Sequence, residues 1–191
     1  MRKLVYFVGM SLDGYIAGPD GDIGFYPLPA DFTAWIGQDY PETLPTHARP
    51  HFGVAVDAPN QRFDTLVMGR GTYAPALSVG ITSPYGHMKQ YVVSSTLGRI
   101  DDPAVELVES DPLALVRRLK AEAGGDIWLC GGGNLAAQLL GELDELVIKS
   151  YPVVAGAGVR AFDGAFQPTL FTPTARREFG NGNQVTWLTR A

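Results

Sequence analysis

The chain has 191 residues, of which 46% are hydrophobic and 18% are charged, and its formal net charge at pH 7 is −5. This length fits a single domain with its own hydrophobic core, so we expect one domain over residues 1–191. The negative charge and the lack of a long basic cluster argue against a nucleic-acid partner. No apolar run reaches the roughly 18 residues that span a membrane, and we expect a cytoplasmic protein. The single cysteine, Cys130, excludes an internal disulfide.

The chain begins with a predicted strand and a predicted helix. Residues 4–10 form a continuous apolar run, which is typical of a strand buried on both faces. Residues 30–39 are expected to form a short helix with Asp31 close to its N-terminus. Residues 40–62 contain four prolines and little periodicity, so we expect a long irregular insertion there.

The rest of the chain alternates strands with short helices. Five further strands are predicted at residues 64–68, 90–94, 105–108, 126–130 and 143–151. Helices are predicted at residues 70–76, 111–123 and 135–140. The last two strands, at residues 171–179 and 184–188, are joined by a Gly-Asn-Gly-Asn turn that favours a hairpin. The alternation predicts an α/β fold, with a mixed, mostly parallel central sheet, helices on both faces and an antiparallel C-terminal hairpin.

A run of three glycines at residues 131–133 comes directly after one predicted strand and precedes a helix. Glycines let the backbone approach a pyrophosphate, and a helix N-terminus offers free N–H groups to it. A standard dinucleotide-binding fingerprint would have an acid about 20 residues later, where this chain has Tyr151. The run therefore indicates either a phosphate site of another kind or a tight strand–helix turn.

Two other glycine motifs differ in the element that each one leads into. Residues 156–161 repeat the glycine spacing, but they lead into no helix, so we expect a flexible or bulged connection between strands. At residues 69–72 a strand again leads into glycine and a helix start. There Arg70 could pair with a phosphate and Thr72 could donate to another oxygen. The alternative is a surface arginine beside a helix cap.

Hydrolytic and metal chemistry receive less support. Ser11 stands near a nucleophile-elbow pattern whose second glycine is missing. His47 and His51 have helical spacing, but Pro50 between them disfavours the helix that would align them. We therefore expect no metal site.

Six segments in order carry a family resemblance. They are residues 11–17, 67–73, 92–96, 131–135, 144–146 and 152–158. Together they resemble the dihydrofolate reductase superfamily. Within it, the chain is similar to the stand-alone proteins related to the reductase domain of the riboflavin-biosynthesis deaminase-reductase, the RibD C-terminal domain family.

The resemblance implies a dihydrofolate reductase-like fold and NADPH as the cofactor. It implies one cis peptide within residues 131–133 and often a homodimer. The residues expected to contact the adenosine and the 2′-phosphate are Arg70, Ser94 and Ser95. Those expected around the pyrophosphate are Gly69, Thr72, Gly131, Gly132, Gly133, Asn134 and Leu135. Those expected near the nicotinamide are Gly9, Ile16 and Ala17.

The resemblance also suggests an acid for catalysis. Residues 28–32 resemble the segment that carries the catalytic carboxylate of dihydrofolate reductases. Asp31 would then hold the polar edge of a pyrimidine or pteridine and supply the proton that accompanies hydride addition. The alternative is that Asp31 only caps a helix. Asp13 is the second candidate, in a turn beside the cofactor.

These expectations define an NADPH-dependent reductase of a small heterocyclic substrate. The best single candidate activity is 5-amino-6-(5-phosphoribosylamino)uracil reductase. The alternatives are a dihydrofolate reductase-like activity, a non-catalytic nucleotide-binding module on the same fold and a hydrolase using Ser11. Two departures bear on the substrate: residues 40–62 border its expected side, and no basic pair is evident for a ribose phosphate.

Overall fold

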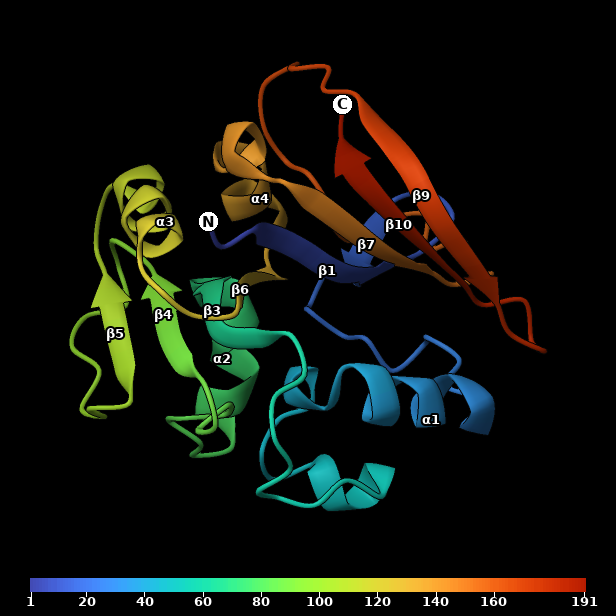
Figure 1. Ribbon diagram of the computed structural model, residues 1–191, viewed down its shortest axis with the longest axis horizontal. Coiled ribbons are helices and arrows are strands. Elements are labelled where there is room, and N and C mark those ends of the chain that lie inside the picture. The colour runs from blue at the N-terminus through green and yellow to red at the C-terminus, as the bar shows by residue number, and fades with distance from the viewer.

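The computed structural model describes residues 1–191 and is built on one eight-stranded sheet (Figure 1). Its strands are β1 (Leu4–Met10), β3 (Phe63–Gly69), β4 (Lys89–Val93), β5 (Val105–Val108), β6 (Asp126–Gly131), β7 (Glu145–Ser150), β9 (Phe171–Glu178) and β10 (Gln184–Arg190). The spatial order is β5-β4-β3-β6-β1-β7-β10-β9. The first six strands of this order are parallel, and β10 pairs antiparallel with both β7 and β9. The expected mixed, mostly parallel sheet with an antiparallel C-terminal hairpin is confirmed.

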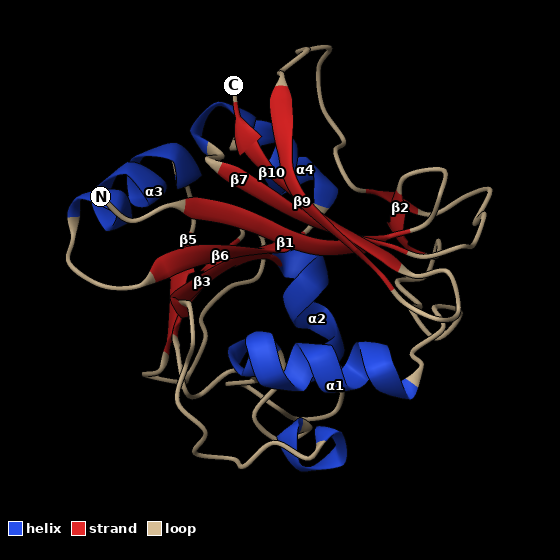
Figure 2. Cartoon of the chain, turned by 45° about the vertical axis from the view of Figure 1, so that its right-hand side comes forward, coloured by secondary structure: helices blue, strands red, loops and turns tan.

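Helices cover both faces of the sheet, as Figure 2 shows. They are α1 (Ala30–Asp39), α2 (Arg70–Ser78), α3 (Pro112–Ala121) and α4 (Gly133–Gln138). Strand β1 shows why the two faces differ, because successive side chains point to opposite sides of a sheet. Val5 and Phe7 join the core cluster under α1 and α2, while Leu4, Tyr6 and Val8 join the cluster under α3 and α4.

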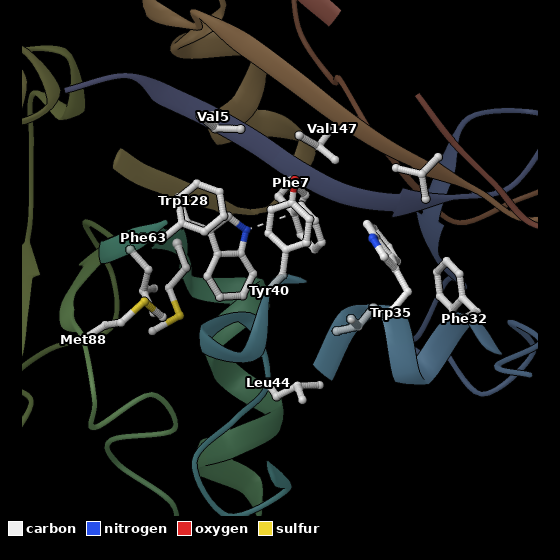
Figure 3. Packing of buried hydrophobic residues seen from close by; sticks show 14 of the residues in the cluster. Val5, Phe7, Phe32, Trp35, Tyr40, Leu44, Phe63, Met88, Trp128 and Val147 are labelled. Atoms are coloured by element: carbon white, nitrogen blue, oxygen red, sulfur yellow. Dashed lines mark hydrogen bonds between the residues drawn. The ribbon is translucent and has the colours of Figure 1, made fainter. Parts of the chain in front are cut away.

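The core under α1 is aromatic. Figure 3 shows Phe7, Trp35, Tyr40 and Trp128 packed together against β1. The ring of Phe7 lies 4.6 Å from that of Tyr40, and the indole N–H of Trp128 donates to the Phe7 carbonyl oxygen at 3.1 Å. The core under α3 and α4 consists mainly of leucine and valine. No helix of the structure has the length and apolar character needed to cross a membrane.

Some boundaries differ from those predicted. The helix expected at residues 135–140 starts two residues earlier, because the glycine turn itself enters α4, and a 3-10 turn at Leu140–Glu142 comes after it. The strand expected at residues 143–151 is the shorter β7. A second, two-stranded sheet was not predicted: β2 (Tyr15–Ala17) pairs with β8 (Val159–Arg160). Strands this short carry no local pattern, and their pairing is decided by distant contacts.

The insertion at residues 40–62 is irregular, as expected, with 3-10 turns at Pro41–Thr43 and Arg49–Phe52. Two buried charged side chains order it. The carboxylate of Glu42 accepts hydrogen bonds from the backbone N–H groups of residues 61, 62 and 63. The Arg49 guanidinium donates to the carbonyl oxygens of Val56 and Ala58. The insertion is therefore fixed to the start of β3.

Candidate functional site

A cavity of about 710 Å³ opens at the carboxyl end of the parallel strands. In open α/β sheets this end is where ligands bind. Eight of the residues expected to bind a cofactor line it: Gly69, Arg70, Ser94, Ser95, Gly132, Gly133, Asn134 and Leu135. They come from the ends of β3, β4 and β6 and from the first turns of α2 and α4, so the fold brings together segments that are up to 66 positions apart.

The other five expected cofactor residues lie outside the cavity lining. Thr72 touches the glycine turn, because a Cβ on Gly131 would lie 3.1 Å from the Thr72 hydroxyl oxygen. Gly9 lies against the ring of Tyr151. Ile16 and Ala17 are on β2, and Ala17 contacts the backbone of Gly158.

The glycine turn at residues 131–133 requires glycine for steric reasons. The Gly131–Gly132 peptide is cis, as the family resemblance implies, and Gly131 has a φ of 152°. A Cβ on Gly133 would lie 2.0 Å from the carbonyl oxygen of Arg160, a contact that no real side chain can make. The backbone of β8 therefore packs directly on the start of α4.

Two helices begin at this cavity in nearly the same way. The N-cap of α2 is Gly69, with φ −80° and ψ 165°, and the N-cap of α4 is Gly132, with φ −81° and ψ 164°. Neither cap supplies a side-chain hydrogen bond, so the first N–H groups of both helices remain available to a ligand. Helix α3 differs, because the Asp111 carboxylate accepts from the Ala114 N–H at 2.9 Å.

This pair of uncapped helix starts fits a diphosphate. Free N–H groups and the positive end of the helix dipole favour anions. Two cations add to this field, Arg70 and Arg160, and neither forms an ion pair. Arg70 donates to the Thr96 hydroxyl at 2.9 Å, which holds it at the mouth of the cavity. The two helix starts and these two arginines therefore suit a dinucleotide phosphate group.

Several residues that line the cavity were not predicted from the sequence. Thr96, Glu109, Asp111, Gly158, Arg160 and Asp163 all line the cavity. The glycine spacing at residues 156–161 is a usable signal for Gly158 and Arg160, because it lets β8 approach the glycine turn closely. No helix follows this spacing, which argues against a dinucleotide fingerprint. The contact between Arg160 on β8 and Gly133 needs only a short strand.

Asp13 lies in the turn between β1 and β2, as expected, but its carboxylate already has partners. It accepts from the Ser11 hydroxyl at 2.7 Å and from the N–H groups of Ala155 and Gly156 at 2.9 and 2.7 Å. These bonds, with that from Ser11 the strongest, lower the pKa of Asp13 to about 2. An acid this strong stays ionised at neutral pH, and its hydrogen bonds join this turn to the loop after β7.

Asp31 occupies the first turn of α1 and is exposed. Its carboxylate accepts from the Phe32 N–H at 2.9 Å and from the Gly180 N–H at 3.2 Å. The second bond joins α1 to the turn of the C-terminal hairpin. Asp31 does not line the 710 Å³ cavity and lies on the aromatic side of the sheet. Ser11 is fully buried and its hydroxyl accepts from the Tyr15 N–H, which gives it a structural role.

Sequence relatives extend over nearly the whole chain. YwjB, an uncharacterised protein of Bacillus subtilis strain 168, is 28% identical over 189 residues, which covers 98% of both chains. YyaP, another uncharacterised protein of that organism, is 27% identical over 196 residues, covering 95% of this chain and 91% of its own.

Solved structures share the fold. A protein from Shewanella sp. PV-4 that has been assigned to riboflavin biosynthesis superposes with a TM-score of 0.73 at 25% identity, covering 100% of this chain and 99% of that one. A deaminase/5-amino-6-(5-phosphoribosylamino)uracil reductase from Thermotoga maritima superposes with a TM-score of 0.64 at 14% identity. This chain covers 57% of that longer protein. The model of the RibD C-terminal domain matches residues 2–185, and the chain therefore belongs to the RibD C-terminal domain family.

Proposed function

We propose that this protein is a reductase that uses a nicotinamide dinucleotide, NADPH in preference to NADH, to reduce a pyrimidine- or pteridine-type heterocycle. One observation carries the proposal: α2 and α4 both have a glycine as N-cap residue, and both present first-turn N–H groups without a side-chain partner to the same cavity. The volume of about 710 Å³ falls within the range of pockets that hold small ligands. Family membership supports the same reading.

In this proposal each wall of the cavity has one task. The N–H groups after Gly69 and Gly132 bind the pyrophosphate, and Thr72 supports the glycine turn from behind. Arg70, Ser94 and Ser95 bind the adenosine end and its 2′-phosphate. Guanidinium and hydroxyl groups are suited to a phosphate dianion. When bound, the dinucleotide supplies the hydride.

We propose 5-amino-6-(5-phosphoribosylamino)uracil as the substrate to test first. The Thermotoga maritima protein carries the name of a reductase of this compound, and its similarity to this chain supports a shared fold. Dihydrofolate is the second compound to test. Of the two carboxylates, Asp31 is the better candidate for holding the polar edge of a heterocycle, because Asp13 already accepts three hydrogen bonds. Asp31→Asn should lower turnover about tenfold at neutral pH without abolishing NADPH binding, as expected for one lost charge-assisted hydrogen bond.

The deciding experiment is a titration of intrinsic tryptophan fluorescence with NADPH and, separately, with NADH. Trp128 lies on β6, three residues before the glycine turn, and should report binding there. Saturable quenching by NADPH at lower concentration than by NADH supports the proposal. Binding without turnover of either heterocycle would favour a non-catalytic nucleotide-binding module. If neither dinucleotide quenches the fluorescence, the reductase proposal fails.

A further inference from the structure

Three neighbouring strands end level with one another at one side of the cavity. Strands β3, β4 and β5 lie side by side in the sheet (Figure 1). The Cα of Val93 on β4 pairs with that of Gly69 on β3 and with that of Val108 on β5. Each of these three is the last residue of its strand. The residues that come next are therefore neighbours along the carboxyl edge of the sheet.

These next residues are a glutamate, a serine and an arginine. In spatial order they are Glu109, Ser94 and Arg70, and all three line the cavity. The Ser94 N–H donates to the Val108 carbonyl oxygen at 3.0 Å, which extends the pairing of β4 with β5 to the point where Glu109 follows. Neighbouring strands lie about 4.8 Å apart, so the backbones of Glu109 and Arg70 are separated by about 10 Å. The edge therefore places an anion and a cation on either side of a hydroxyl group.

Neither of these two charges is neutralised within the fold. Glu109 and Arg70 form no ion pair, and both side chains are exposed. Ser94 between them is only 8% exposed, and its hydroxyl oxygen accepts from the N–H groups of Thr96 and Leu97 at 3.2 and 3.0 Å. Ser94 is therefore part of a fixed floor, and a ligand above it lies in the field of both charges.

The cavity contains two other carboxylates, and neither competes with Glu109 for this position. The Asp111 carboxylate caps α3 by accepting from the Ala114 N–H. Asp163 belongs to the opposite wall, where its backbone N–H donates to the Gly133 carbonyl oxygen at 3.0 Å. Glu109 is therefore the carboxylate that lies beside Ser94 and has no capping role.

A dinucleotide in this cavity would place a nucleoside over the same edge. In the proposed function the pyrophosphate binds at the helix starts after Gly69 and Gly132. From there the lining continues over the ends of β4 and β5 to the start of α3, whereas β1 and β7 contribute no lining residue. One nucleoside must therefore extend toward Ser94 and Glu109. A carboxylate holds the ribose 2′-hydroxyl in many NAD sites, and an arginine accommodates the 2′-phosphate in NADP sites.

We propose that Glu109 is a specificity-determining residue, which admits NADH beside NADPH by opposing the 2′-phosphate that Arg70 attracts. This inference rests on the proposed dinucleotide site and adds the group that limits its preference for NADPH. The 2′-phosphate is the only difference between the two cofactors. A nearby carboxylate therefore weakens NADPH binding by charge repulsion and leaves NADH binding unaffected. Binding sites commonly obtain specificity from a repulsive group of this kind.

The test is a titration of tryptophan fluorescence with NADPH and with NADH, in a series that changes the charge at residue 109 in single steps. The wild type is negative at this position, Glu109→Gln is neutral and Glu109→Lys is positive. The ratio of NADPH affinity to NADH affinity should rise about fivefold at each step, as expected for one exposed charge beside a phosphate. Glu106→Gln lies on the same strand but outside the cavity, and this control should leave the ratio unchanged.

Salt provides a second readout in the same titrations. Because Glu109 is exposed, the gain in Glu109→Gln should shrink to about twofold or less in 1 M salt, where the Debye length is about 3 Å. A gain that persists in 1 M salt would overturn the inference, since its source would be shape and not charge. A ratio that stays at the wild-type value in both variants would also overturn it, while the cofactor proposal stands. If neither dinucleotide binds to the wild-type protein, the reductase proposal fails and this inference fails with it.

Discussion

The two ends of the parallel sheet use their charged residues in opposite ways. At the amino end, Arg2 pairs with Asp64, Lys3 pairs with Glu145, and Arg62 bridges Asp126 and Glu145. These pairs join the starts of β1, β3, β6 and β7. At the carboxyl end, Arg70, Lys149 and Arg160 form no ion pairs, and the helices begin on bare glycines.

The contrast separates stability from binding. A charge that is already paired within the fold contributes to stability and has little left for a ligand. An unpaired cation or an uncapped helix N-terminus is an incomplete interaction, which a bound anion can complete. Removing one partner of an ion pair at the amino end is therefore expected to lower the stability of the fold. Changing the backbone shape at the carboxyl end is expected to weaken ligand binding.

The largest effect is expected from Gly133→Ala. Its Cβ would lie 2.0 Å from the Arg160 carbonyl oxygen, so β8 must move away from the start of α4. A displacement of this size should weaken NADPH binding about 100-fold in a fluorescence titration. Gly71→Ala is the matched control in the same cavity, because its Cβ would meet no atom within 4 Å. Equal binding by the two variants would show that the glycine turn does not shape the site.

A smaller effect, on stability alone, is expected from Arg62→Met at the other end. This change leaves two partly buried carboxylates, Asp126 and Glu145, without their shared cation. The free energy of unfolding should fall by about 2 kcal/mol in urea titrations, with NADPH affinity unchanged. Arg99→Met removes an exposed pair with Asp101 and should cost about 0.5 kcal/mol or less. A loss of NADPH binding in Arg62→Met would contradict the claim that the amino end serves stability and the carboxyl end serves binding.

Arg70→Met should produce a change of about tenfold in affinity, and only for one cofactor. The guanidinium lies at the mouth of the cavity, bonded to Thr96, where a 2′-phosphate could complete its hydrogen bonds. NADPH affinity should fall about tenfold and NADH affinity should stay the same. Arg117→Met, an exposed residue on α3, is the control. Equal losses of affinity for the two dinucleotides would indicate that Arg70 contacts the pyrophosphate and not the 2′-phosphate.

The smallest effect is a pH dependence that originates at the amino end. Burial opposes ionisation of Glu145, but hydrogen bonds from Arg62 and Lys3 outweigh burial and lower the pKa of its carboxyl below the usual value. The stability that this shift contributes is complete above the unfolded pKa and is lost as the pH falls through the folded pKa. Urea midpoints measured from pH 7 down to pH 3 should decrease, and the decrease should be shallower in Arg62→Met. An identical slope in both proteins would exclude Glu145 as its source.

Much of the fold could be predicted because its signals are local. The apolar run of β1, the Asp111 cap of α3 and the hairpin turn after β9 each depend on residues close in sequence. Six of the eight cofactor positions in the cavity lie at the strand–glycine–helix junctions after β3 and β6, which end at the same edge of a parallel sheet. The other two, Ser94 and Ser95, were expected from the family resemblance alone. The place of Arg160 in the cavity could not be predicted in this way. Arg160 reaches the cavity only through the pairing of β8 with β2, across more than 140 residues.

The sequence alone determined which segments form the eight strands of the main sheet and the four helices, because backbone geometry and apolar periodicity act over a few residues. The tertiary structure alone decided which charged side chains form ion pairs and which remain unpaired. Arg62 finds two carboxylates because β6 and β7 start on either side of β1, while Lys149 finds only the ring of Phe7. Both outcomes result from the order of the strands in the sheet, and that order is set by packing between segments far apart in the chain.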